Sequence, residues 1–287
     1  MSVLSPSRCI ALALAAALNT ACAQGPSSDK AEKGAAMTEN SAESRTVDGY
    51  TYTTHPVEAR IGPHRFAFPA NYYDDQIGPA VGGGVGLTFL WPSMEAAQPG
   101  SRTDRSMEDQ YRSVVVSIDH VDKTPIGELL ERLTTTDPTT AEGSLSTRDP
   151  LRRLDQRVAG EPTMGLTPFL IDEAKIPAFA AAFEQETGMP YKGDSLNSDD
   201  WYISQAAGGP IETFIKCDSR KRMADGLTIE GNRLVSQQTG RVAACTHYFV
   251  DVPDSLAIRM NYSRAVLADW KRMESDVRAA LARYKVK

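Results

Sequence analysis

The chain has 287 residues, of which 41% are hydrophobic and 24% are charged, and its formal net charge is -6 at pH 7. A mildly acidic chain is a poor partner for nucleic acid or for an anionic membrane face, so we expect neither as a ligand. The length is sufficient to bury a sizeable core, in one large domain or in two small ones.

The first 22 residues are typical of a secretory signal peptide. One positive charge, Arg8, precedes the apolar run "CIALALAAAL", and the small residues "TACA" come shortly after it. This run has too few apolar residues to cross a bilayer, which needs roughly 20. We therefore expect residues 1–22 to be a cleaved leader and the mature protein to lie in the periplasm.

Two processing routes remain open at the end of this leader. Cleavage after Ala23, at an A-x-A site, would release a soluble protein that begins at Gln24. Alternatively, "LNTAC" resembles a bacterial lipobox in which Cys22 becomes the lipidated first residue, although Asn19 stands where such boxes usually carry Leu. By the same resemblance, Ala23 directly after the cysteine would send a lipid-anchored protein to the outer membrane.

Residues 23–46 are expected to form a flexible tether. From Gln24 to Ser44 the chain contains no aromatic residue and no Leu, Ile or Val. Such a segment cannot bury enough apolar surface to offset the entropy that it would lose on ordering. A flexible coil of this size has a root-mean-square reach of about 25 to 30 Å, which would hold a folded domain clear of lipid headgroups.

Residues 47–136 are expected to form an N-terminal α+β subdomain. Stretches rich in β-branched and aromatic residues, bounded by Pro, Gly and Asp, predict strands at 64–73, 85–92 and 112–121. The sequence "TPIGELLERL" at 124–133 predicts a short helix that closes them. The polar, turn-rich stretch that continues to residue 160 is the best candidate for an internal boundary.

Residues 160–287 are expected to form a second α+β subdomain. A helix is predicted at 176–190, where two phenylalanines lie four residues apart and Gly and Pro follow. A long helix should begin after Ser263, a typical N-cap residue, because apolar residues then recur at intervals of three and four. Further strands are predicted at 200–205, 211–218, 242–252 and 256–263.

The predicted fold class is therefore α+β, with antiparallel sheets each closed by a helix. Two related subdomains are one interpretation of this order, although no sequence identity at a fixed period supports a repeat.

The cysteines indicate one disulfide bond. Cys9 and Cys22 belong to the leader region, so Cys217 and Cys245 remain. In an oxidising compartment, two cysteines are the number expected for a single disulfide. Closing a loop of this length would contribute roughly 3 to 4 kcal/mol to stability. A metal pair or a reactive thiol is the alternative, but no C-x-x-C spacing supports it.

No catalytic constellation stands out in the sequence. The letters "GDSL" at 193–196 match a motif of serine esterases, but no D-x-x-H sequence follows to supply a base, and a serine without a base is a weak nucleophile. His247 is expected to be a hydrogen-bonded structural residue. The sequence therefore predicts no enzyme, no cofactor and no metal site; an envelope hydrolase that uses Ser195 with His247 is the weakest alternative.

A resemblance covers most of the chain beyond the tether. It is carried by "IGPHRFAFPANYY", "VGLTFLWPSME", "FIKCDSR", "AACTHYF" and "MNYSRAVLADWKRME". These stretches are similar to envelope proteins and lipoproteins of Gram-negative bacteria, several of which resemble immunity proteins of type IV and type VI secretion-system effectors, of the lipase-immunity type. The resemblance implies a periplasmic, non-catalytic protein that binds and neutralises a secreted toxic effector, with a lipid anchor if Cys22 is modified. A structural or assembly lipoprotein of the envelope is the alternative.

Such a protein is expected to contact its partner through loop aromatics and carboxylates. Tight interfaces concentrate their energy in aromatic anchors and desolvated charge pairs. Two loops of the sequence offer both kinds of side chain. The candidate partner-binding residues are Tyr72, Tyr73, Asp74, Asp75, Asp199, Asp200 and Trp201.

Overall fold

The structure describes four stretches of the chain. The computed structural model describes residues 43–80, 84–135, 141–237 and 240–287, and clustering of contacts places residues 41–287 in one compact unit. The predicted leader, Cys22 and the tether up to residue 42 lie outside the described residues. No helix among the described residues is long and apolar enough to cross a membrane.

The last residues of the expected tether belong to a hairpin. Strand β1 (Ser44–Val47) pairs with β2 (Tyr50–Thr53) in antiparallel register. The turn between them consists of Asp48 and Gly49, both with positive φ. An Asp-Gly pair is a strong signal for a two-residue hairpin turn. The polar composition predicted a tether that extends to residue 46. The structure differs because the Asp48-Gly49 turn brings residues 44–47 into a paired strand.

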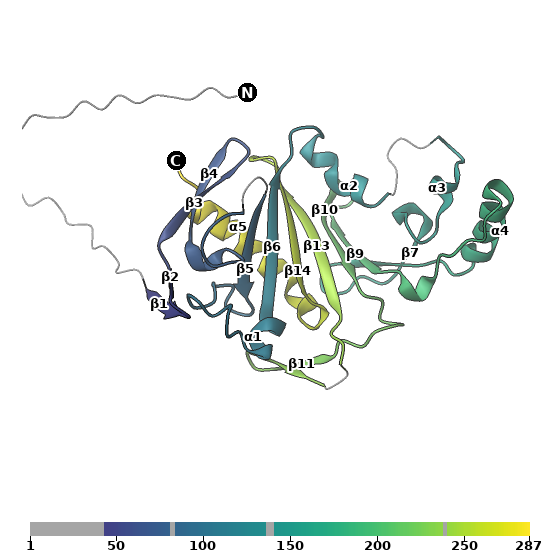
Figure 1. The fold of residues 1–287 in the computed structure, drawn as a ribbon. Helices are drawn as coiled ribbons and strands as arrows, with labels where there is room; N and C mark the ends of the chain where they lie inside the picture. Colours follow the sequence, from purple (N-terminus) through teal and green to yellow (C-terminus); the bar gives the residue numbers. More distant parts are fainter. Residues whose placement is uncertain (1–42, 81–83, 136–140, 238–239) are drawn as a thin grey trace, which may run out of the picture. The chain divides into compact units, whose positions relative to one another are not determined.

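One eight-stranded antiparallel sheet organises the described chain (Figure 1), with strand order β5-β6-β14-β13-β10-β9-β8-β7. The strands are β5 (Val85–Leu90), β6 (Ser113–His120), β14 (Leu256–Ser263), β13 (Ala244–Asp251), β10 (Ile211–Cys217), β9 (Asp200–Gln205), β8 (Thr167–Leu170) and β7 (Val158–Ala159). The predicted α+β class, with antiparallel strands and helices, is confirmed.

The two expected subdomains do not form separate sheets. Strand β6 comes from the expected N-terminal subdomain and β14 from the expected C-terminal one, yet they pair along six residues, with Ile118 opposite Ile258. Each strand buries alternate residues, so pairing them side by side merges their apolar faces. The segments 47–136 and 160–287 therefore share one sheet and one core.

One face of the sheet is covered by α5 (Trp270–Tyr284), which runs along the sheet beside β5, β6 and β14 in Figure 1. Its apolar residues recur at helical spacing, so Trp270, Met273 and Val277 all face the sheet and are buried. Ser263 caps the turn before this helix by accepting a hydrogen bond from the backbone N–H of Ala265. That turn, η5 (Arg264–Asp269), is a 3-10 helix, so the long helix begins six residues later than expected.

A hairpin of β3 (Pro56–Ile61) and β4 (His64–Pro69) covers the C-terminal end of α5. The ring of Phe68 lies 5.4 Å from that of Tyr284 at the end of the helix. After β4 the chain enters η1 (Ala70–Tyr72), so the predicted strand at 64–73 ends four residues early.

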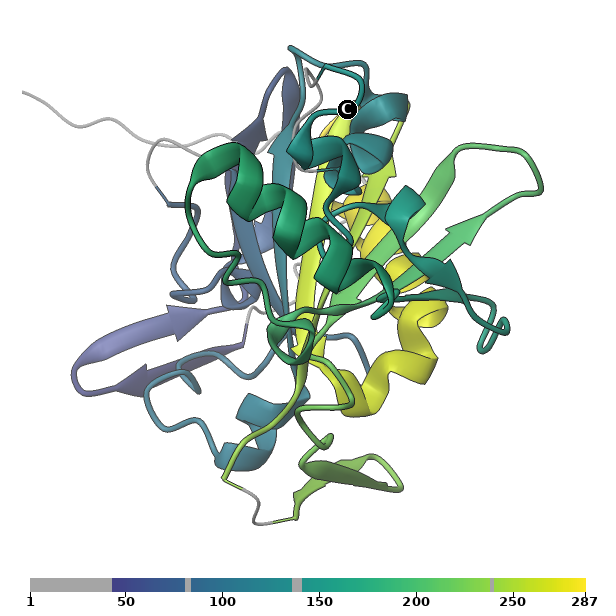
Figure 2. The same cartoon turned by 90° about the vertical axis from the view of Figure 1, so that its right-hand side faces the viewer.

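The opposite face of the sheet is partly covered by the chain between β6 and β9 (residues 121–135 and 141–199), which we call the excursion; its strands β7 and β8 extend the sheet itself. It contains η2 (Ile126–Glu128), α2 (Leu129–Leu133), α3 (Leu145–Arg148), η3 (Leu154–Gln156), β7, β8, α4 (Lys175–Thr187) and η4 (Ser195–Asn197). Leu130 of α2 packs with Trp201, Ile203 and Phe214 in a second hydrophobic cluster. In Figure 2, which looks at the molecule from the β7–β8 end of the sheet, α4 lies nearest the viewer.

The predicted helix at 176–190 corresponds to α4, which ends at Gly188 in the left-handed conformation. Two elements remain at the other end of the sheet: α1 (Met107–Arg112), and the hairpin of β11 (Leu227–Glu230) with β12 (Arg233–Ser236).

A disulfide bond between Cys217 and Cys245 joins β10 to β13, as predicted. The two residues are direct partners in the antiparallel register, and both are buried. The loop that the bond closes carries the β11–β12 hairpin.

Replacing both cysteines with alanine should lower the free energy of unfolding by roughly 3 to 4 kcal/mol, because the unfolded chain regains the entropy of an open loop. Urea denaturation of the oxidised protein and of the Cys217→Ala/Cys245→Ala variant would measure this difference. Dithiothreitol should destabilise the wild type and leave the variant unchanged; an equal response of both would contradict a stabilising disulfide.

Candidate functional site

The two predicted tyrosines are core residues. Tyr72 is 4% exposed and Tyr73 is 1% exposed. The Tyr72 hydroxyl donates to the Glu95 carboxylate at 2.7 Å, and the Tyr73 hydroxyl donates to the Val57 carbonyl at 2.7 Å. The expectation that these side chains are loop anchors is wrong, because a buried ring whose hydroxyl is already paired has no surface to offer a partner.

The neighbouring aspartates are exposed but shape their own loop. Asp74 accepts a hydrogen bond from the Thr88 hydroxyl at 2.8 Å. Asp75 accepts from the backbone N–H groups of Ile77 and Gly78. This loop adjoins β5, at one end of the strand order, through the bridge between Tyr73 and Leu87.

The second predicted group lies at the start of β9, with four strands of the sheet between it and β5. Asp200 accepts a hydrogen bond from the backbone N–H of Arg220 at 2.8 Å. Asp199 and Trp201 line a groove, which we call the arm groove because one of its walls is α4 with the loop that follows it. The structure therefore separates the two predicted loops and places Asp199 and Trp201 of the second loop at this groove.

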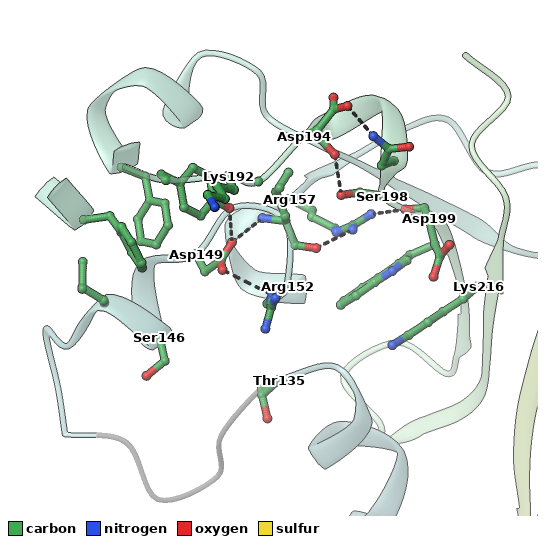
Figure 3. A pocket seen from close by; sticks show the side chains of 18 of the residues that line it. Thr135, Ser146, Asp149, Arg152, Arg157, Lys192, Asp194, Ser198, Asp199 and Lys216 are labelled. Atoms are coloured by element: carbon green, nitrogen blue, oxygen red, sulfur yellow. Dashed lines mark hydrogen bonds and ion pairs between the residues drawn. The ribbon is translucent and has the colours of Figure 1, made fainter. Parts of the chain in front are cut away.

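The arm groove has a volume of about 1110 Å³ and lies between the outer face of β9 and β10 and the excursion (Figure 3). Phe179 and Phe183 of α4 form one wall together with Tyr191, whose ring centre lies 5.0 Å from that of Phe179 and 5.4 Å from that of Phe183. Trp201 and Lys216 line the groove from the sheet. The groove thus combines an aromatic wall with charged groups.

Two cations lie over the ring of Trp201. The Arg157 guanidinium carbon is 3.9 Å from the ring centre, and the Lys216 Nζ is 4.9 Å from it. Lys216 is opposite Trp201 in the register of β10 and β9, so the sheet fixes this pair. Phe214, two residues before Lys216, places its own ring edge-on to Trp201 at 5.0 Å. Cations are attracted to the negative faces of aromatic rings, and more strongly where water is excluded.

Arg157 ties the groove together. It is 7% exposed, and its guanidinium donates to the backbone carbonyls of Phe169, Asp199 and Leu151 at 3.2, 2.9 and 2.8 Å. Burial lowers the pKa of Arg157 to about 10, in spite of nearby carboxylates, so the side chain is charged at neutral pH. A single buried cation thereby holds three separate backbone segments around Trp201.

Lys216 and Asp199 carry charges that the described part of the chain does not neutralise in an ion pair. Burial lowers the pKa of Lys216, and Asp199 opposes that shift. Although Asp199 reaches solvent, partial burial raises the pKa of its carboxyl group. Each shift reflects a charge held partly out of water, and Lys216 and Asp199 attract each other without approaching to ion-pair distance.

The other carboxylates of the groove are already engaged within the fold. Asp149 accepts from the Leu151 N–H at 2.9 Å and from the Tyr191 hydroxyl at 3.2 Å, and it lies 3.7 Å from the Arg152 guanidinium. Asp194 caps the turn η4 by accepting from the backbone N–H of Leu196.

Sequence reasoning missed Arg157 and Lys216. Arg157 lies in the polar stretch that was predicted to be an internal boundary. No hydrophobic periodicity in that stretch indicates that its side chain is buried. Lys216 occupies a strand whose alternation does place it on the same side as Phe214. That alternation, combined with the register to Trp201, could have identified Lys216 had the strand order been known.

Ser195 and His247 do not form a catalytic pair. His247 is fully buried between the sheet and α5, where its Nε2 lies 3.3 Å from Glu274 and its Nδ1 lies 3.3 Å from the Tyr262 hydroxyl. Ser195 lies in the turn η4, between α4 and β9, whereas the hydrogen-bond partners of the His247 ring are Glu274 and Tyr262. No group of three or more His, Cys, Asp or Glu side chains that could hold a metal ion occurs among the residues that the structure describes.

Comparison with known proteins gives one informative match. No family model matches the sequence, and no curated protein matches it. Among solved structures, the chain is similar to Smlt3025, an immunity protein of the Stenotrophomonas maltophilia type IV secretion system. The two sequences are 42% identical, the match covers 85% of this chain and 99% of that chain, and the TM-score is 0.79.

Replacing Arg157 with lysine should lower the free energy of unfolding by roughly 2 to 4 kcal/mol, because one ammonium group cannot reach three carbonyls in different segments. Arg152→Lys is the matched control: its side chain is 67% exposed, so the same exchange should change stability by about 0.5 kcal/mol or less. Urea denaturation would measure both. Equal stability of the two variants would contradict the structural role of Arg157.

Burial lowers the pKa of His247, so the folded protein holds this imidazole neutral. Below the ordinary histidine pKa of about 6.5, the unfolded chain binds a proton that the folded chain does not bind, and stability therefore falls as the pH falls. The variant His247→Gln, which cannot titrate, should lose less stability than the wild type between pH 7.5 and pH 5.5. Thermal unfolding at both pH values would measure this, with the exposed His55→Gln as the control. A His247→Gln variant with the pH dependence of the wild type would refute the assignment.

Proposed function

The chain belongs to the family of the type IV secretion-system immunity protein Smlt3025, and from this membership we propose that it binds a secreted toxic effector and neutralises it. The observation that carries the proposal is the 42% identity, which extends over 99% of the related chain. Common ancestry along nearly the whole of a protein supports a shared role more strongly than a shared architecture does.

Neutralisation by binding suits the construction of this protein. An inhibitor of this kind needs a rigid surface and no reaction of its own. The disulfide and the three-carbonyl bonding of Arg157 both stiffen the part of the sheet that borders the arm groove. A surface that is already ordered loses little entropy on association, and this favours tight binding.

We further propose that the protein acts in the periplasm. The leader at 1–22 and the disulfide between Cys217 and Cys245 both fit an oxidising compartment. Attachment to the outer membrane through a lipidated Cys22 is the more specific proposal. The polar segment after Cys22 would then set the distance between the lipid and the folded unit.

The proposal predicts that the mature chain, beginning at Gln24, forms a one-to-one complex with the secreted product of the adjacent gene and blocks its toxicity. Co-expression with that product targeted to the periplasm should restore growth when the immunity chain carries its leader, and should fail when residues 1–22 are deleted. Growth curves would measure protection, and calorimetry with the purified proteins would measure binding.

A chain that neither binds nor protects would refute the proposal. Recovery of envelope-assembly components instead of the effector, in a pull-down from envelope extract, would support a structural lipoprotein in its place.

A further inference from the structure

One charged side chain of the arm groove has no carboxylate of the described chain at ion-pair distance. Lys216 is half-buried against the rings of Trp201 and Phe214, and no carboxylate of the described chain lies within ion-pair distance of its Nζ. Among the groove carboxylates, Asp149 and Asp194 are bonded within the fold. Asp199 is more exposed to water than Lys216, and its attraction to Lys216 acts without contact at ion-pair distance. The group that would gain most from a new partner is therefore the ammonium of Lys216.

A second cation faces the same space. In Figure 3 the charged ends of Arg152 and Lys216 both point into the open part of the groove. The Arg152 side chain is 67% exposed, and its contact with Asp149 is long, at 3.7 Å. Both cations line the open groove and favour negative charge there.

The size of the groove favours a polypeptide as the occupant. Its volume of about 1110 Å³ exceeds the range of roughly 300 to 1,000 Å³ that is typical of small-molecule sites. The wall of Phe179, Phe183 and Tyr191 offers apolar contact beside the two cations. An extended chain that carries an acidic side chain next to an apolar one would satisfy both features at once.

We propose that the arm groove receives a segment of the effector that pairs an aspartate or glutamate side chain with Lys216, in the open space that Arg152 also faces, and lays an adjacent apolar side chain against the aromatic wall. This inference rests on the proposed function, and it names the surface and the chemistry of recognition. The carboxylate pairs with an ammonium that is already desolvated, so the fold has met part of the cost of burying that charge.

The test is the affinity of the purified product of the adjacent gene for variants of the mature chain. Lys216→Met removes the charge and keeps a long apolar stem over Trp201. It should weaken binding by about 10- to 100-fold, mainly through faster dissociation. Arg152→Met should weaken binding by about 3- to 10-fold, because this side chain is more exposed and more strongly screened.

The matched control is Lys271→Met, which removes an identical charge from an exposed position on α5, the element on the other face of the sheet. Its affinity should stay within about 2-fold of the wild type, as expected for a charge far from the contact.

Thermal unfolding of each variant checks that the fold is intact. A folded Lys216→Met protein that binds like the control would overturn the proposed groove while leaving the immunity role in place. A wild type that fails to bind the product would overturn the proposed function and this inference with it.

Zero-length carbodiimide coupling of the wild-type complex provides a second readout. An amide bond between the Lys216 amine and an aspartate or glutamate of the effector, located by mass spectrometry, is the expected product. Coupling confined to lysines outside the groove would place the contact elsewhere and overturn the assignment.

Discussion

The antiparallel pairing of β6 with β14 is the constraint on which the rest of the structure depends. Ile118 and Ile258 are opposite each other although 140 positions separate them in the chain. Closing so long a loop costs entropy that only extensive burial offsets. The pairing is favourable because both strands present a continuous apolar face to the same helix, α5. Once the two strands pair, the chain between them must leave the sheet at the end of β6 and return to the same place at the start of β14.

The two faces of this shared sheet differ in what they contact. The face toward α5 is apolar and contains the His247–Glu274 hydrogen bond, so it supplies stability. The opposite face is partly covered by the excursion, whose short elements leave the arm groove open beside β9 and β10. A groove open to solvent can therefore carry half-buried charge that a core would not tolerate.

Local signals in the sequence predicted most of the strands and helices, but they did not predict which of these elements pack against each other. Alternation predicted β10, β13 and β14 closely, and cysteine parity predicted the disulfide. Burial of Tyr72 and Tyr73 was not predictable, because an aromatic residue beside two aspartates has the composition of a loop whether it points inward or outward. The groove was hidden for a different reason: it depends on strand order, which unites Trp201, Lys216 and Arg157 from three separate segments. A non-local arrangement of this kind leaves no periodic trace in the sequence.

The alternation along β10 limits how this protein can change over evolution. Thr213, Ile215 and Cys217 face α5, while Phe214 and Lys216, between them, face the excursion, and Lys216 lines the groove. Inserting or deleting one residue in β10 would exchange the two sets, turning the disulfide cysteine toward the groove and the lysine toward the core. New specificities in this part of the groove must therefore arise by substitution at fixed positions, whereas the loops of the excursion can also vary in length. Two relatives with different partners should accordingly align without gaps in β10 and accumulate their insertions between β6 and β9.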